Sequence, residues 1–374
     1  MSAWSPSHLN EAKILVVRND GLGDFVLTLP LVAALKQQLP GARIYALVNQ
    51  HLQGLLPLLP DLEGMIVDEG VLLKRHRNLY APRERKERRR DLLEQIKAQR
   101  FDLALLPYSE AASAALIHRA RIPWRAGSGR RIYGWRFNLR NTASRKGSQS
   151  AEYELNLTYL ARLGLEQTFT APRVKPPTPQ AGGDFDPGGR DYVVIHPHKR
   201  SSTALSWPIG NFVELARKFL RAGLDVTVVG DEPDAPVLRE HFGQLRELRV
   251  ATGLSLPELV GLIARARLFV GNSSGPLHVA GLTGTPHIGF YPQNRVSSAA
   301  RWRTLPVPDG PGASHRYLLE SSFPKNCVTC EMEKCTYFNC VASISMERVD
   351  GAMRAWGLDL NGESGKGDLQ ATGS

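Results

Sequence analysis

Apolar residues in this chain gather in short uninterrupted runs, which alternate with longer stretches where apolar positions recur at helical spacing. The first run, KILVV at residues 13–17, predicts a strand buried on both faces. The stretch at 25–39 follows it and predicts a helix whose inner face consists of Val26, Leu29, Val32, Ala33 and Leu35. Further strands are expected at 43–49, 65–69 and 101–107. This alternation is typical of an α/β fold with a parallel sheet.

The second half of the chain repeats the plan. Strands are predicted at 192–197, 225–231, 248–253, 268–272 and 286–291, and helices at 211–223, 235–242, 256–266 and 276–284. A stretch at 171–190, rich in proline and glycine, separates the two halves. We therefore predict a Rossmann-like domain over 1–170, a linker over 171–190, a second Rossmann-like domain over 191–360 and a polar, disordered tail over 361–374.

Basic residues outnumber acidic ones by 47 to 36 in the 374 residues, for a net charge of +11. The excess is concentrated in residues 74–146, which hold twenty basic and six acidic side chains. Such a surface favours an anionic partner. The segment 83–99 is also typical of an ordinary solvated helix with interleaved glutamates. The segment 119–146, which includes Arg130 and Arg131, contains no acid and is the better candidate for an acceptor or membrane surface.

No apolar run approaches the roughly 18 to 20 residues that cross a bilayer, and the first residues lack the pattern of a secretory signal. We therefore expect a cytoplasmic protein. The spacing of its four cysteines, Cys327, Cys330, Cys335 and Cys340, is tight enough for a structural zinc bound by four thiolates. Only one CxxC pair is present, however, so thiols or disulfides packed against the sheet stay open as alternatives.

Ligands of open α/β sheets bind beyond the carboxyl ends of the strands, so the loops after the strands are the candidate sites. The loop NDGLGD at 19–24 follows the first strand, but its glycine spacing is not the GxGxxG of nicotinamide-nucleotide sites. A carboxylate here, such as Asp24, can act as a general base. The structural alternatives are a helix N-cap for Asp24 and a turn residue for Asp20.

The loop HPHKRSST at 196–203 combines cations with hydroxyls in the second half of the chain. Lys199, Arg200 and Ser201 therefore suit phosphate oxygens, although solvated loop charges are the alternative. The acidic loop at 230–234 is placed to accept hydrogen bonds from ribose hydroxyls, or to cap a helix in solvent.

The segment GNSSGPLH at 271–278 predicts a strand end running into a helix, with a proline in the first turn. The N-H groups at such a helix start favour a diphosphate. Ser273 or Ser274 is expected to cap this helix whether or not a ligand binds. His278 lies in the first turn, where a packed histidine is the ordinary interpretation.

Four ordered motifs resemble those of glycosyltransferase family 9, the lipopolysaccharide heptosyltransferases of Gram-negative bacteria. They are GLGDFVLTLPLVAALK, HPHKRSSTALSWPIGNFVELARKFLRAG, VATGLSLPELVGLIARA and VGNSSGPLHVAGLTGTP, and the similarity extends over about residues 13–350. The resemblance implies a GT-B architecture of two facing Rossmann-like domains. The first would bind an acceptor and the second a nucleotide-sugar donor, typically ADP-heptose, with no metal or other cofactor.

Carried onto this sequence, the family's Gly-x-x-Gly-Asp motif places the general base at Asp24. The resemblance implies a donor site built from Lys199, Arg200, Ser201, Glu232, Ser273, Ser274, Gly275, Pro276 and His278. It implies acceptor contacts from Asn19, Gly23, Arg130 and Arg131. The acceptor would be an anionic glycolipid at the inner face of the cytoplasmic membrane, where polybasic surfaces associate peripherally.

Two positions depart from the family pattern. Ser273 stands where relatives usually carry an aspartate, and Leu205 and Ser206 precede the Trp-Pro pair where many carry a lysine. The alternative is therefore a catalytically silent relative that binds anionic lipid or RNA through its basic region. Aromatic residues for RNA stacking are present among 108–137, but the chain contains no RNA-binding motif, so no nucleic acid partner is expected.

Overall fold

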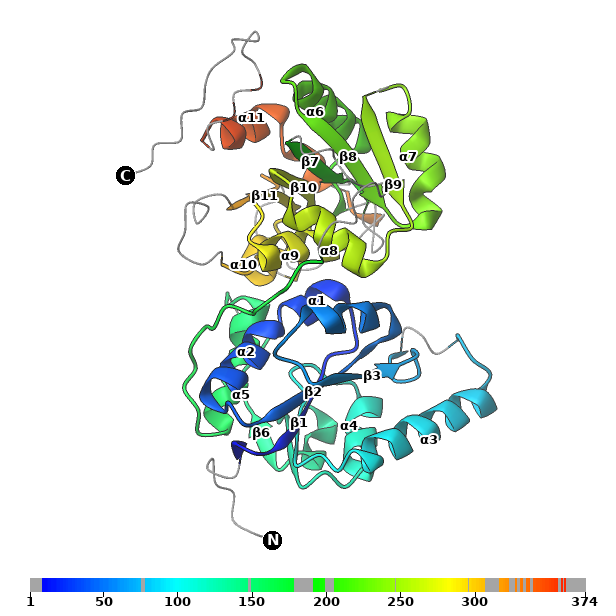
Figure 1. The fold of residues 1–374 in the computed structure, drawn as a ribbon, viewed down its shortest axis with the longest axis vertical. Helices are drawn as coiled ribbons and strands as arrows, with labels where there is room; N and C mark the ends of the chain where they lie inside the picture. The colour runs from blue at the N-terminus through cyan, green and yellow to red at the C-terminus, as the bar shows by residue number, and fades with distance from the viewer. Residues whose placement is uncertain are drawn as a thin grey trace.

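The computed structural model describes residues 9–74, 78–146, 149–177, 191–198, 205–245, 247–294, 296–306, 316–322, 327, 330–331, 334–336, 339–355, 358 and 360. Two six-stranded sheets organise these residues, and every strand pair in both sheets is parallel. Figure 1 shows the two sheets, each with its own helices, one above the other. The predicted α/β class with two Rossmann-like units is confirmed.

The first sheet has the order β3-β2-β1-β4-β5-β6. Its strands are β1 (Lys13–Val17), β2 (Arg43–Asn49), β3 (Gly64–Asp68), β4 (Leu103–Leu105), β5 (Trp124–Ser128) and β6 (Leu139–Asn141). β1 lies in the centre with four of its five residues buried, as the unbroken apolar run predicted. The pattern did not predict β5 and β6, which both carry an arginine; β6 is a three-residue strand at the sheet edge, and β5 lies next to it.

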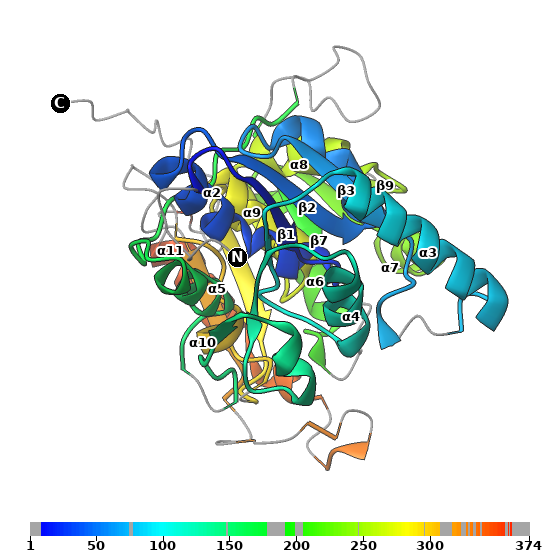
Figure 2. The ribbon, with the colours of Figure 1, turned by 90° about the horizontal axis from the view of Figure 1, so that it is seen from below.

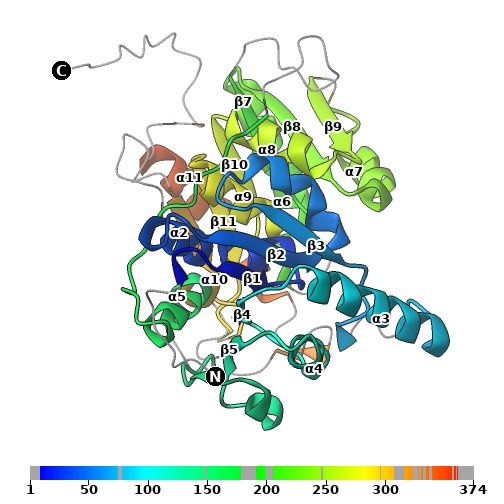
Figure 3. The ribbon, with the colours of Figure 1, turned by 60° about the horizontal axis from the view of Figure 1, so that its bottom comes forward.

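Helices cover both faces of this sheet (Figure 2). They are α1 (Leu22–Val26), α2 (Leu29–Gln38), α3 (Pro82–Ala98), α4 (Ala111–Arg119) and α5 (Glu152–Arg162). Side chains of α2 and α5 pack with Ile14 and Val16 of β1, whereas α3 and α4 pack with Leu15 and Val17 on the opposite face. Figures 2 and 3 show α3, the predicted cationic helix, projecting from the side of the domain.

The single helix predicted at 25–39 is wrong in one respect, because the chain breaks between α1 and α2 at Leu27 and Thr28. Pro30, which lacks an N-H, lies in the first turn of α2 and favours a helix start there. The side-chain amide of Asn156 on α5 then donates to the Leu27 carbonyl at 3.0 Å. The five apolar positions predicted for the inner face are all buried.

The second sheet has the order β12-β11-β10-β7-β8-β9, the same arrangement as the first sheet read from its other edge. Its strands are β7 (Tyr192–His196), β8 (Asp225–Gly230), β9 (Leu248–Thr252), β10 (Leu268–Asn272), β11 (His287–Tyr291) and β12 (Arg316–Glu320). Helices α6 (Ile209–Arg221), α7 (Ala235–Phe242) and α11 (Met346–Ala355) cover one face. Helices α8 (Leu256–Ala264) and α9 (Gly275–Thr283) cover the other, and α10 (Ala299–Trp302) follows β11. In each sheet the strand order reverses at the first strand of the unit, β1 or β7. Ligands of this fold bind beside such a reversal.

The two units contact each other through α1 and α9 and through α8 and the 3-10 helix η2 (Gln50–Leu58). Figure 1 shows α1 beneath α8 and α9. One apolar cluster runs from Leu52 and Leu55 of the first unit to Val260 and Leu262 of the second. The carboxyl-end loops of both sheets thus meet at this contact, which is the GT-B arrangement of two facing Rossmann-like domains.

Among the described residues, no helix is both long and apolar enough to cross a bilayer. The four cysteines are present as thiols, each partly buried. Within the part of the chain that the structure describes, no group of three or more His, Cys, Asp or Glu side chains is arranged to hold a metal ion. The predicted tail over 361–374 and most of the predicted linker, from 178 to 190, lie outside the described residues.

Candidate functional site

Asp24 lies in the first turn of α1, directly beyond the carboxyl end of β1. The Arg18 guanidinium, on the residue after β1, donates to the Asp24 carboxylate at 2.5 Å. The Asp24 side chain is 26% exposed, whereas the Arg18 side chain is 2% exposed. Asp24 is therefore held from the protein side and open on the other, as a group that exchanges a proton with a ligand must be.

Arg18 binds three carboxylates at once. Its Nε donates to Asp20 at 2.9 Å and its Nη1 to Glu152 at 3.0 Å, in addition to Asp24. The ring of Tyr108 lies 5.5 Å from the guanidinium carbon. Burial alone would lower the pKa of Arg18, but the three carboxylates raise it well above its usual range, so the residue is a permanent cation.

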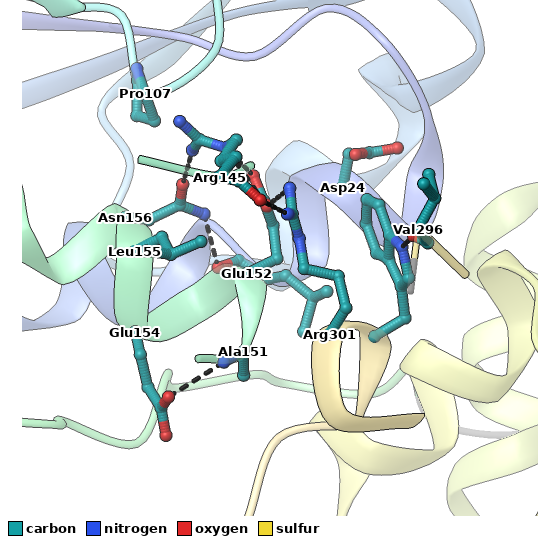
Figure 4. Close-up of polar contacts among 12 residues, drawn as sticks. Asp24, Pro107, Arg145, Ala151, Glu152, Glu154, Leu155, Asn156, Val296 and Arg301 are labelled. Atoms are coloured by element: carbon teal, nitrogen blue, oxygen red, sulfur yellow. Dashed lines mark hydrogen bonds and ion pairs between the residues drawn. The ribbon is translucent and has the colours of Figure 1, made fainter. Parts of the chain in front are cut away.

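Glu152, the first residue of α5, is 1% exposed and is shared by arginines from both domains. Arg145 donates to Glu152 at 2.9 Å, and Arg301 of α10 donates to its other oxygen at 2.6 Å. Figure 4 shows these two arginines converging on Glu152 close to Asp24. Burial favours the neutral form of Glu152, but Arg18, Arg145 and Arg301 outweigh it and lower its pKa.

The environment of Asp24 has the opposite effect. Burial, followed by the neighbouring charge of Asp20, raises the pKa of Asp24 to about 7, although Arg18 acts against the shift. Glu152 adds a smaller effect in the same direction as Asp20. One guanidinium shared among three carboxylates cannot fully compensate each of them. Asp24 is thus a carboxylate near neutral pH that is a stronger base than an ordinary aspartate.

In the second domain, β10 leads into α9 through Ser273 and Ser274, and Ser274 is the N-cap residue by position. The predicted hydroxyl cap is wrong, because the Ser274 hydroxyl donates to the Asn272 carbonyl at 3.0 Å instead of accepting from the first turn of α9. The same hydroxyl lies 3.2 Å from Nδ1 of His196 at the end of β7. Among the described residues no N-cap side chain binds the first turn of α9, so the start of this helix can bind an anion.

A buried asparagine organises the loops around this helix start. Asn272 accepts a hydrogen bond from the Trp207 backbone N-H and donates one to the Pro197 carbonyl, both at 2.7 Å. It thereby joins β10 to both ends of the loop that follows β7. Burial lowers the pKa of His196 to about 4, so the imidazole there is neutral at physiological pH.

Helices α1 and α9 approach so closely that two glycines are required. A Cβ on Gly23 would lie 2.6 Å from the ring of His278, and one on Gly275 would lie 2.9 Å from Leu22. His278 is buried and packs across the domain contact, which agrees with the interpretation of a packed histidine. Asp24, next to Gly23, therefore lies on the helix that packs against α9 of the second domain.

The remaining candidates are spread around this contact. Asn19 is buried and donates to Asp68 at 2.5 Å, so its amide is directed into the first domain. Glu232 is exposed after β8, with its carboxylate 2.5 Å from the position of a Cβ on Gly253. Lys199, Arg200 and Ser201 lie outside the described residues, and Pro276 is the second residue of α9.

Arg130 and Arg131 are exposed between β5 and the 3-10 helix η4 (Ile132–Arg136). Burial is the main cause of a raised pKa at Tyr108, and the charges of Arg131 and Arg18 both act against it. The charges of Arg131 in the basic segment and of Arg18 beside Asp24 therefore both act on Tyr108.

The sequence analysis did not identify Arg18, Arg145, Glu152 or Arg301. A signal existed for Arg18, because an arginine that directly follows a buried apolar strand must find carboxylate partners. Glu152 begins a helix with an ordinary charge pattern, and Arg301 lies in a four-residue helix, so neither position differs locally from a solvated one.

Residues 89–315 match glycosyltransferase family 9 (heptosyltransferase). Lipopolysaccharide heptosyltransferase 3 of Escherichia coli is 26% identical over 285 residues, which are 72% of this chain and 79% of that protein. The structure of E. coli ADP-heptose lipopolysaccharide heptosyltransferase II superimposes with a TM-score of 0.69 at 20% identity, covering 92% of this chain and 98% of that one. An E. coli heptosyltransferase solved with ADP superimposes with a TM-score of 0.68 at 16% identity, covering 92% of this chain and 99% of that one.

Proposed function

The chain belongs to glycosyltransferase family 9, the heptosyltransferase family, and from this we propose that it is an inverting enzyme that uses Asp24 as its general base. The donor is a nucleotide-activated heptose or related sugar, ADP-heptose in the first place. The acceptor is a hydroxyl of the lipopolysaccharide core or of a similar anionic glycan. The observation that carries the proposal is a partly exposed carboxylate with a raised pKa, held by Arg18 on the helix that packs against α9.

In the proposed reaction the acceptor hydroxyl attacks the anomeric carbon of the donor sugar. A new carbon–oxygen bond forms, the hydroxyl proton moves to Asp24, and the bond to the diphosphate breaks with its electron pair on the leaving oxygen. The base and the leaving group lie on opposite faces of the sugar, so the configuration inverts. A carboxylate with a pKa of about 7 suits this role, because it is ionised above neutral pH yet more basic than an ordinary aspartate.

We assign the leaving diphosphate to the start of α9. Positive charge of the helix dipole and the N-H groups there stabilise an anion. Ser273, Ser274 and Gly275 contribute to this site, and Lys199, Arg200 and Ser201 supply further donors from the loop after β7. Ser273 replaces the acid of the family pattern, so the diphosphate meets no carboxylate at that position. This leaves the helix start more favourable to an anion.

We assign the ribose of the donor to Glu232, which follows β8 as the ribose-binding acid of Rossmann folds follows its second strand. The related E. coli heptosyltransferase is solved with ADP, which supports adenine as the base of the donor. Pro276 fixes the first turn of α9, and His278 contacts Gly23 across the domains. Pro276 and His278 therefore position the helix start that forms the donor site.

We propose that the glycolipid acceptor approaches along η4. Ile132 is 100% exposed and Trp135 is 60% exposed, and the guanidinium of Arg136 lies 4.5 Å from the Trp135 ring. Exposed Arg130 and Arg131 precede them. Apolar tips among arginines suit an anionic lipid surface, where tryptophan occupies the interface and cations contact headgroups. On this proposal the protein associates peripherally with the inner face of the cytoplasmic membrane.

The test of the base is a transfer assay with ADP-heptose and heptose-deficient lipopolysaccharide core, with ADP affinity measured in parallel by titration calorimetry without added metal. Asp24→Asn is expected to lower kcat by roughly 10²- to 10⁴-fold and to leave ADP affinity unchanged. The control variant Asp225→Asn alters an acid at the opposite, amino end of β8 and should retain activity. Near-normal turnover in Asp24→Asn would exclude the base assignment.

Titration against GDP, UDP and CDP in the same experiment tests the donor. Selective binding of ADP supports the assignment, whereas selective binding of another diphosphate replaces it. Binding of none of the four, together with binding of anionic vesicles, would favour the alternative of a silent relative with a basic lipid-binding surface. For the membrane face, Arg130→Glu with Arg131→Glu should abolish sedimentation with phosphatidylglycerol vesicles at low salt. Unchanged sedimentation would exclude this surface.

A further inference from the structure

Glu152 is the point at which the second domain contacts the charge cluster of the first. One oxygen accepts from Arg18 at 3.0 Å and Arg145 at 2.9 Å, both in the first domain. The other accepts from Arg301 of the second domain at 2.6 Å (Figure 4). Arg301 also donates to the Arg145 carbonyl at 3.0 Å. The two domains are therefore joined at a buried carboxylate that lies one guanidinium away from Asp24.

The charges of the first domain do not balance without Arg301. Asp20, Asp24 and Glu152 supply three carboxylates, and among the residues that the structure describes Arg18 and Arg145 are the cations of that domain paired with them. Tyr108 stacks on Arg18, and His278 contacts the neighbouring Gly23 from α9. One buried negative charge is thus in excess until Arg301 binds. An uncompensated buried charge is strongly unfavourable, and a proton on a carboxylate is the simplest way to remove it.

Arg301 is presented by a short helix that is fixed to the second domain. The backbone N-H of Ala299 donates to Glu320 at 2.7 Å, and the Tyr291 hydroxyl donates to the Trp302 carbonyl at 2.9 Å. The Trp302 indole N-H donates to the Val296 carbonyl at 2.6 Å. Arg301 therefore moves with the second domain as a rigid body, and its distance to Glu152 depends on how the domains are closed.

We propose that Arg301 is a positioning residue that couples closure of the two domains to the catalytic base, because its contact with Glu152 completes the charge balance around Arg18 and Asp24. This inference rests on the proposed role of Asp24. In the closed enzyme Arg301 compensates Glu152, so a larger fraction of Asp24 is ionised than in the open enzyme, and Arg18 orients its carboxylate. In the open enzyme the excess negative charge favours the protonated, inactive form of Asp24. Transfer then begins only when both domains have closed over donor and acceptor.

The chain contains a matched control for this contact. Arg303 also reaches α5 from the second domain, where its guanidinium binds Glu154 at 2.5 Å. Glu154 is 39% exposed, and its second oxygen accepts from the backbone N-H of Ala151. Both arginines therefore join the same two elements. Only Arg301 contacts the carboxylate that Arg18 binds.

The experiment is the pH dependence of kcat and kcat/KM for the full chain with ADP-heptose and lipopolysaccharide core. Arg301→Gln removes a positive charge. The acidic limb of the pH–rate profile of this variant should therefore move to higher pH by roughly half a unit or more, and kcat at pH 7 should fall several-fold. Glu152→Gln removes a negative charge and should move the limb to lower pH. Arg303→Gln should keep the wild-type limb, and Arg301→Lys, which retains the positive charge, should keep the limb close to its wild-type position.

Each outcome decides the proposal. Equal effects of Arg301→Gln and Arg303→Gln on KM, without a shift of the limb, would show that Arg301 only holds the domains together. If Arg301→Gln does not fold, as judged by circular dichroism and ADP binding, the direction of the Glu152→Gln shift decides instead. Wild-type turnover in Asp24→Asn would refute the proposed base, whereas an inactive Asp24→Asn with an unshifted Arg301→Gln would refute only the coupling.

Discussion

The two sheets have the same strand order, yet the groups at their carboxyl ends differ in kind. At the end of β1, Arg18 binds Asp20, Asp24 and Glu152 through full charges. At the equivalent end of β7, His196 is neutral and contacts a serine hydroxyl. A shared topology thus provides two ligand positions and leaves their chemistry open. The charged end suits proton transfer, and the neutral end beside a helix start suits an anion that is released.

The loops after β1 and β7 are also fixed in different ways. Arg18 holds the first loop with ion pairs, each of which depends on the others for its charge balance. Asn272 holds the second with two neutral hydrogen bonds, to the Trp207 N-H and the Pro197 carbonyl. A neutral amide tolerates a nearby phosphate without changing its own charge. Four substitutions, each with a measured change in stability, test whether this contrast is real.

The largest effect is expected at Arg18. Arg18→Met leaves three carboxylates at one buried position without their shared cation, and breaking a buried ion pair in this way costs about 3–5 kcal/mol. Urea denaturation at pH 7.5 measures the loss. Arg162→Met is the control, because this exposed arginine donates to Thr142 on the surface of the same domain and should change stability by less than about 0.5 kcal/mol. A loss at Arg18 no larger than that of the control would remove the contrast.

A smaller effect is expected at Asn272. Asn272→Ala leaves two buried backbone groups without partners, at about 1–3 kcal/mol for each. Asn138 provides a closely matched control, since it accepts from the Arg125 N-H and donates to the Pro123 carbonyl, both at 2.7 Å, but at an exposed position. Water replaces the lost bonds there, so Asn138→Ala should be nearly neutral. Equal losses for the two variants would mean that burial of the amide is not what fixes the loop.

Much of the fold could be predicted from the sequence because its central strands are buried on both faces. The predicted bounds of β1, β2 and β10 match the structure to the residue. The strands that were missed, β5, β6 and β12, contain polar or half-buried residues, and β6 and β12 are edge strands that pair with one neighbour each. Apolar runs report burial, so an edge strand produces a weak pattern.

The residues of the candidate site likewise fall into those that a local pattern could identify and those that it could not. Asp24 could be identified because it follows a recognisable strand within a short motif. Glu152 lies 134 residues from Arg18 and 149 from Arg301, and it becomes a shared ligand only when the chain has folded. Local spacing contains no information on contacts of that range. The hydroxyl cap predicted at α9 was wrong for a related reason, because the Ser274 hydroxyl is taken by the Asn272 carbonyl.

The last test is a pair of opposite pH dependences, each gradual along the pH scale. Burial raises the pKa of Asp24 to about 7, above its ordinary value of 3.8, so between these values the folded state holds a proton that the unfolded chain releases. The free energy of unfolding therefore falls as pH rises through this window. Burial lowers the pKa of His196 to about 4, below its ordinary 6.5. Here the unfolded chain binds the proton, and the free energy of unfolding rises with pH from 4 to 6.5.

Each slope is at most about 1.4 kcal/mol per pH unit, and urea denaturation at a series of pH values measures it. Asp24→Asn should be more stable than the wild type at pH 8, with a difference that shrinks toward pH 4, although it is inactive. His196→Gln should lose the rising slope below pH 6.5, which the exposed control His241→Gln should keep. If Asp24→Asn were less stable at pH 8, the ionised carboxylate would be a favourable partner of Arg18. The groups at the carboxyl end of β1 would then be a structural ion-pair cluster that does not destabilise the ionised form of Asp24.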